Sequence, residues 1–133
     1  SGYMIVQYSS AGLVGEIRVL SHPASVDSVP TCAFQEDYVS MGYNAAMKAY
    51  KVVRLAEYVL GNELLTAVQA AGLRAQKELP LSPVTAAVGA AVREKAPFME
   101  NDHYISPDME WARELVHSGR VRETAERYIG GLY

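Results

Sequence analysis

The sequence predicts an all-α fold in which long antiparallel helices form part of a helical bundle. Apolar residues recur at helical spacing in two long segments, 3–20 and 41–73. Two Ser-Pro pairs, Ser82-Pro83 and Ser106-Pro107, are typical of helix starts. No segment shows the strict alternation that predicts a half-buried strand, so helices packed on helices are the expected architecture.

The first expected helix covers residues 3–20. Its apolar positions include Ile5, Leu13 and Ile17, and Ser1 could cap its start. It carries little charge, so it needs cover on most sides. His22-Pro23 ends it, because the residue before a proline is pushed out of the α region.

Residues 22–37 form a long connection without a clear period. Its prolines, serines and threonines favour irregular backbone. Connections of this length without regular structure are often functional.

The second expected helix runs over residues 41–73, with Ser40 as its N-cap and Gly72 marking its end. Its polar residues share a stripe of roughly 60° at 100° per residue. They are Asn44, Lys48, Lys51, Asn62, Thr66 and Gln69. Because short neighbouring helices cannot wrap so apolar a helix, other chains or other parts of the polypeptide are expected to complete its cover.

Three charged residues of this helix, Arg54, Glu57 and Glu63, fall outside the polar stripe. The simpler interpretation is that they form ion pairs across a helix bundle. The alternative is that they face an interface or a site.

Two further helical regions follow, over residues 83–95 and 107–128. Ser82 is expected to cap the first, and Ala96-Pro97 to end it. Gly119 is expected to break the second region into two pieces.

Composition and charge exclude several classes of protein. The net charge is −3, and the arginines near the C-terminus alternate with glutamates, as on a solvated helix face, so no nucleic-acid surface is expected. No run reaches the ~18 apolar residues of a membrane span, and no basic leader precedes the first helix, so no membrane contact and a cytoplasmic location are expected.

Few residues have the spacing of a metal site or of a nucleophile. His22, His103 and His117 lie far apart, and no metal site is expected. His103 is interpreted as an ordinary loop residue. Cys32 is the single cysteine and is expected to be a buried or half-buried bystander, which suits a reducing compartment.

The most informative cluster is Gln35-Glu36-Asp37, just before the second long helix. Asp37 suits the N-terminal end of that helix, where exposed N–H groups favour an acidic side chain. Glu36 is then a second carboxylate, which could bind an ammonium group or exchange protons. Helix-end chemistry alone explains only one of the two carboxylates.

Several stretches together resemble the C-terminal part of the histidine ammonia-lyase family. The main one is Gln35-Glu36-Asp37-Tyr38-Val39-Ser40-Met41-Gly42. The others are Ser1-Gly2-Tyr3-Met4-Ile5, His22-Pro23-Ala24-Ser25-Val26-Asp27-Ser28, Pro30-Thr31, Asp102-His103-Tyr104 and Ser106-Pro107-Asp108. Residues 1–133 are thus expected to be one helical segment at the C-terminal end of a larger ammonia-lyase.

The resemblance implies an all-α homotetramer whose subunits associate through long apolar helices. The family eliminates ammonia from an amino acid, and histidine gives urocanate. It uses a methylidene-imidazolone electrophile that forms from an Ala-Ser-Gly tripeptide. This sequence has no Ala-Ser-Gly, since Ala24-Ser25 is followed by Val26. The electrophile, a catalytic tyrosine and a carboxylate-binding arginine are therefore expected in a missing upstream portion, and the chain alone is expected to lack lyase activity.

By resemblance, Glu36 is the expected catalytic residue, and Gln35 and Tyr3 are expected to bind the small-molecule amino acid substrate. Many histidine lyases carry a histidine where this chain has Tyr38. This departure leaves a tyrosine or phenylalanine ammonia-lyase, or an aminomutase, as an alternative. A non-catalytic helical oligomerisation module is the third hypothesis.

Overall fold

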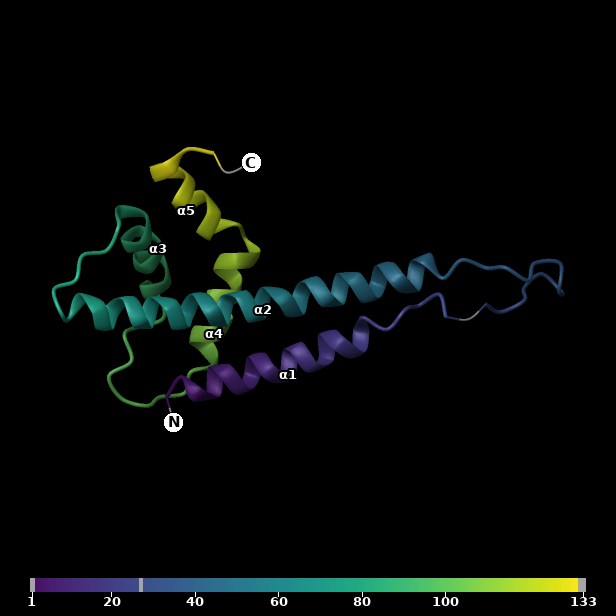
Figure 1. Ribbon diagram of the computed structural model, residues 1–133, viewed down its shortest axis with the longest axis horizontal. Coiled ribbons are helices and arrows are strands. Elements are labelled where there is room, and N and C mark those ends of the chain that lie inside the picture. The colour runs from purple at the N-terminus through teal and green to yellow at the C-terminus, as the bar shows by residue number, and fades with distance from the viewer. Residues whose placement is uncertain (1, 27, 132–133) are drawn as a thin grey trace.

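The computed structural model describes residues 2–26 and 28–131, and this part of the chain is built from five helices. Helices α1 (Met4–Leu20) and α2 (Gly42–Ala75) are long and run antiparallel. Helices α3 (Pro83–Arg93), α4 (Ser106–His117) and α5 (Arg120–Ile129) are short and gather near the C-terminal half of α2 (Figure 1). The predicted all-α fold is confirmed.

Helix α1 has Tyr3 as its N-cap residue. The predicted cap, Ser1, lies outside the described residues. The helix ends at Leu20, as the sequence before Pro23 predicts.

The predicted start of α2 is wrong in two respects. Helix α2 begins at Gly42, its N-cap residue is Met41, and no side chain caps it, so Ser40 is not the N-cap. No acidic residue lies in its first turn, so Asp37 does not serve the helix end. Both residues precede the helix, and the Asp37 carbonyl accepts a hydrogen bond from the Ser28 hydroxyl at 2.9 Å in the segment between α1 and α2.

Gly72 does not end α2, which continues to Ala75. A Cβ atom at Gly72 would lie 2.7 Å from Cδ2 of Phe98, inside contact distance. The glycine therefore permits close packing of the segment after α3 rather than helix termination.

Two residues of the predicted polar stripe are buried. Asn62 is 1% exposed and donates from Nδ2 to Ser10 Oγ at 3.0 Å. Gln69 is 9% exposed, and its amide group donates to the Met99 carbonyl at 2.9 Å and accepts from the Met99 N–H at 3.1 Å. The stripe thus supplies hydrogen bonds to neighbouring elements of the same chain.

Helices begin at both Ser-Pro pairs, as predicted, but only the first serine acts as the N-cap. Ser82 caps α3 by accepting from the Thr85 N–H at 3.2 Å, with Pro83 as the first helical residue. Helix α4 includes Ser106 and lacks a side-chain cap. Gly119 separates α4 from α5 with a φ of 77°, which a glycine adopts without strain.

The core lies where the start of α1, the second half of α2, α3 and α4 meet. It contains Val6, Leu65, Val68, Val92, Ala96, Ile105, Ala112 and Leu115. Helices α2 and α4 approach most closely at Gly61, where an added Cβ would lie 2.6 Å from the Arg113 backbone nitrogen. This crossing fixes α4 on α2.

An ion-pair cluster joins α2 to α4 beside this crossing. Glu57 Oε1 lies 2.9 Å from His117 Nδ1, and Glu57 Oε2 lies 3.9 Å from both Arg54 and Arg113. Glu57 pairs across the bundle with Arg113 and His117 of α4, as predicted. Arg54 pairs with Glu57 inside α2 itself. Glu63 is exposed.

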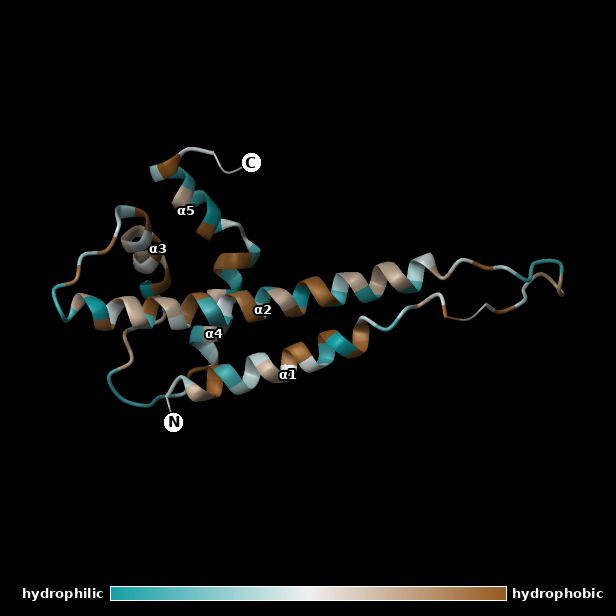
Figure 2. Cartoon of the chain, viewed as in Figure 1, coloured by the Kyte–Doolittle hydropathy of each residue, from teal (hydrophilic) through white to brown (hydrophobic). Residues whose placement is uncertain are grey.

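The first half of α2 leaves apolar side chains exposed beyond its contact with α4. Tyr43 is 79% exposed, Tyr50 61% and Val53 57%. Figure 2 shows hydrophobic residues along this part of the helix as well as near the core. None of the helices in the described part of the chain has the length and hydropathy of a membrane span.

Candidate functional site

The described residues between α1 and α2, 21–26 and 28–41, form a hairpin that extends beyond the ends of both helices (Figure 1). It carries the Gln35-Glu36-Asp37 cluster close to its tip. The two long helices therefore act as a support that projects this cluster away from the core.

Thr31 and Glu36 close the tip of the hairpin. The Thr31 N–H donates to the Glu36 carbonyl at 2.7 Å, and the Glu36 N–H donates to the Thr31 carbonyl at 3.2 Å. The Thr31 hydroxyl also donates to Glu36 Oε2 at 3.1 Å. Backbone and side chain of Glu36 are thus both held by one residue.

The turn between these two residues has an unusual backbone. Cys32, Ala33 and Phe34 have positive φ values of 50°, 52° and 69°. Each costs roughly 1–2 kcal/mol, because the left-handed region brings Cβ close to the following carbonyl oxygen. The Gln35 N–H donates to the Cys32 carbonyl at 3.1 Å across the turn.

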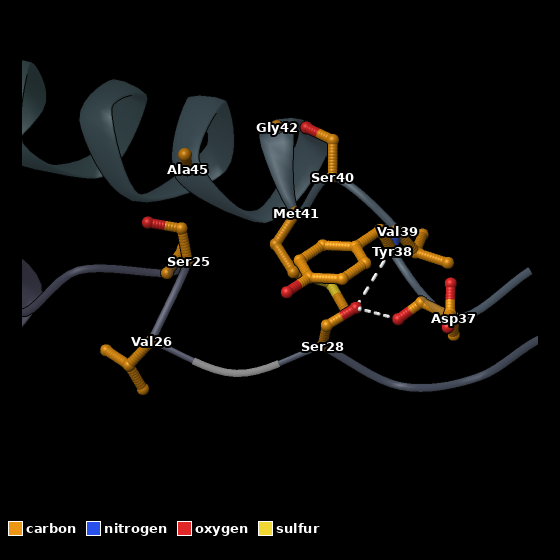
Figure 3. Close-up of a pocket in the computed structure, with 11 residues that line it drawn as sticks. Ser25, Val26, Ser28, Asp37, Tyr38, Val39, Ser40, Met41, Gly42 and Ala45 are labelled. Carbon is orange, nitrogen blue, oxygen red and sulfur yellow. Dashed lines mark hydrogen bonds between the residues drawn. The ribbon is translucent and has the colours of Figure 1, made fainter.

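Ser28 ties the two sides of the hairpin closer to its base. Its hydroxyl donates to the Asp37 carbonyl at 2.9 Å and accepts from the Val39 N–H at 3.0 Å (Figure 3). An open cleft lies on this side, lined by residues from both arms of the hairpin and the start of α2. Asp37 and Tyr38 are among its lining residues.

Gln35 and Glu36 are both exposed at the hairpin tip. Cys32 is exposed as well, so the expectation of a buried or half-buried cysteine is wrong. The reason is its place in the hairpin turn, outside the helices that form the core.

Tyr3 lies at the opposite end of α1 from the hairpin (Figure 1). The 17 residues of α1 at 1.5 Å per residue separate it from the hairpin by ~25 Å. Its side chain is half-buried and packs against the core, and burial raises the pKa of its hydroxyl against the opposing charge of Arg93. Within this chain, Tyr3 therefore does not share a site with Glu36.

Two features of the structure were not predicted from the sequence. Thr31 and Ser28 hold the hairpin, but hydroxyl residues in an irregular segment carry no periodic signal. His103, interpreted as an ordinary loop residue, places Nε2 2.9 Å from Oδ2 of the buried Asp108. This hydrogen bond raises the pKa of His103, against partial desolvation.

Comparison with a solved structure identifies the helical arrangement. The chain superposes on the crystal structure of histidine ammonia-lyase from Trypanosoma cruzi with a TM-score of 0.87 and 41% sequence identity, over 96% of this chain and 25% of that one. The hairpin and its flanking helices are thus part of an ammonia-lyase type of fold.

The sequence comparisons agree. The family model for aromatic amino acid lyases matches residues 1–94, and the chain belongs to this family. It is 46% identical over 132 residues to histidine ammonia-lyase from Symbiobacterium thermophilum, covering 99% of this chain and 26% of that protein. It is 48% identical over 123 residues to histidine ammonia-lyase from Myxococcus xanthus, covering 91% and 23% respectively. The chain spans about a quarter of the length of the curated relatives it matches.

Proposed function

We propose that this chain supplies the Glu36 side of a histidine ammonia-lyase active site, in which ammonia is eliminated from L-histidine to give urocanate. The observation that carries the proposal is the 46% identity to a histidine ammonia-lyase over 99% of the chain. The exposed position of Glu36, hydrogen-bonded to Thr31 in the hairpin, is consistent with a role in binding a substrate.

Glu36 is proposed to receive the substrate. Its carboxylate uses Oε2 to accept from Thr31, and a carboxylate has lone pairs for several further donors. Because the side chain is exposed at the tip, an ammonium or imidazole N–H can reach it. It can then orient the substrate or exchange a proton with it.

The residues of this chain cannot form the family's electrophile, because the sequence contains no Ala-Ser-Gly. A methylidene-imidazolone group, which withdraws electron density from the amino acid, would have to come from upstream sequence. The chain alone is accordingly proposed to be inactive.

The remaining proposals concern assembly and location. The exposed apolar face of α2 supports self-association, with a homotetramer as the proposed state of the intact enzyme. A cytoplasmic location is proposed because a free, exposed thiol suits a reducing compartment.

The test is a chimera in which this chain replaces the matching segment of the Symbiobacterium thermophilum histidine ammonia-lyase. Urocanate formation from L-histidine is followed by absorbance. We expect activity, and we expect Glu36→Gln to lower kcat/KM about a hundred-fold or more, because the amide cannot exchange protons. Glu100→Gln, at another exposed carboxylate, is the matched control and should retain activity.

A correctly folded chimera with no activity on histidine would contradict the proposed function. Full activity of the Glu36→Gln chimera would contradict the role of Glu36. Assays with tyrosine and phenylalanine distinguish the substrate, since coumarate or cinnamate without urocanate would favour a related lyase.

A further inference from the structure

We propose that Thr31 is a positioning residue that holds the Glu36 carboxylate in its working orientation. Thr31 makes three hydrogen bonds to Glu36, two between the backbones and one from its hydroxyl to Oε2. This inference rests on the proposed function, in which Glu36 contacts the substrate.

The backbone pair holds a turn that is costly by itself. Three consecutive residues without glycine, Cys32 to Phe34, occupy the left-handed region. A chain free at both ends would leave this conformation, so the turn persists because Thr31 and Glu36 fasten its two ends. The fastening places Glu36 at a fixed point of the hairpin.

The hydroxyl hydrogen bond adds control of the side chain. A glutamate has several rotatable bonds, and ordering it on substrate binding would cost entropy. The hydrogen bond from Thr31 Oγ1 to Oε2 orders the side chain before the substrate binds, so this entropy is not lost on binding. It fixes one carboxylate oxygen and thereby sets the direction of the other.

The experiment uses the chimera described above with four variants. Thr31→Val keeps the β-branched shape and the backbone pair but removes the hydroxyl, and Thr31→Ser keeps the hydroxyl. Glu36→Gln and the double variant Thr31→Val with Glu36→Gln complete a double-mutant cycle. Thr85→Val, at an exposed threonine whose hydroxyl contacts Ser82, is the matched control.

We expect Thr31→Val to lower kcat/KM about ten-fold, because hydrogen bonds to charged groups are stronger than neutral ones. The loss should fall on kcat more than on KM. Thr31→Ser should stay within about two-fold of wild type, as should Thr85→Val. In the Glu36→Gln background, Thr31→Val should cause no further loss.

Each other outcome has a defined meaning. Wild-type activity of Thr31→Val, with Glu36→Gln impaired, would overturn the role of Thr31 and leave the proposed function standing. Independent, multiplying losses in the double variant would show a purely structural role and would also overturn it. Unfolding of the Thr31→Val chimera, checked by circular dichroism, would likewise overturn the positioning role of Thr31. Wild-type activity of Glu36→Gln would overturn the proposed role of Glu36 itself.

Discussion

At the scale of single residues, the His103–Asp108 pair makes the stability of the chain depend on pH. The hydrogen bond to Asp108 raises the pKa of His103 above its ordinary value of 6.5. The folded chain therefore binds this proton more tightly than the unfolded chain. The resulting stabilisation is fully present below pH 6.5 and is lost as the pH rises through the raised pKa of the folded state.

The His103→Gln variant tests this dependence. We expect the difference in unfolding free energy between wild type and His103→Gln to shrink as the pH rises from about 6 to about 9. Urea unfolding followed by circular dichroism measures it, with Asp108→Asn as the companion variant that removes the acceptor. A difference that stays constant over this pH range would contradict the coupling.

At the residue scale, sequence patterns also failed to predict which polar side chains are buried. Asn62 and Gln69 belong to the polar stripe of the sequence pattern, yet both are buried. Asn62 is hydrogen-bonded to Ser10 of α1, and Gln69 to Met99 in the segment after α3. A pattern of residue types records polarity, not the partner that satisfies it. Glu36 was singled out by the pair of adjacent carboxylates and by the family resemblance, but its hydrogen-bond partner, Thr31, has no signature in the sequence.

At the scale of elements, the crossing of α2 and α4 depends on Gly61. A Cβ there would lie 2.6 Å from the Arg113 backbone nitrogen and 2.8 Å from its Cα. Backbone cannot move aside as a flexible side chain can, so the two helices would have to separate.

Paired glycine substitutions test this close approach. Gly61→Ala should destabilise the chain by about 2 kcal/mol, because overpacking outweighs the gain in helix propensity. Gly12→Ala, in α1 where an added Cβ meets nothing within 4 Å, should stabilise it by up to ~1 kcal/mol. Urea unfolding at one protein concentration compares the unfolding free energies of the two variants. Equal changes of the same sign would contradict the close approach of α4 to Gly61.

Helix boundaries were predicted well where local chemistry alone decides them. Ser82-Pro83 and Gly119 act through their own backbone preferences, and both are confirmed. Ser40 and Gly72 have similar local chemistry, yet Ser40 does not cap α2 and Gly72 does not end it. At Gly72 the reason is tertiary, because the glycine makes room for Phe98. Long-range contacts of this kind cannot be deduced from neighbouring residues.

At the scale of the whole molecule, one end is compact and the other is uncovered. The core gathers around the start of α1 and the second half of α2, while the rest of α1, the first half of α2 and the hairpin extend away from it (Figures 1 and 2). At 100° per residue, Tyr43, Met47 and Tyr50 share a stripe of about 60°. That stripe lies on the side opposite Ala45 and Val52, which face the end of α1.

This stripe is the expected surface for self-association, because exposed hydrophobic side chains gain free energy when water leaves them. We expect the chain to sediment as an oligomer at micromolar concentration. Met47→Glu should weaken association at least about ten-fold, since a carboxylate would have to be buried in the contact. Gln76→Glu, which adds the same charge at the exposed end of α2, should leave association unchanged. A monodisperse monomer for the wild-type chain would show that no surface joins the subunits. Equal association of the two variants would show that a different surface joins them.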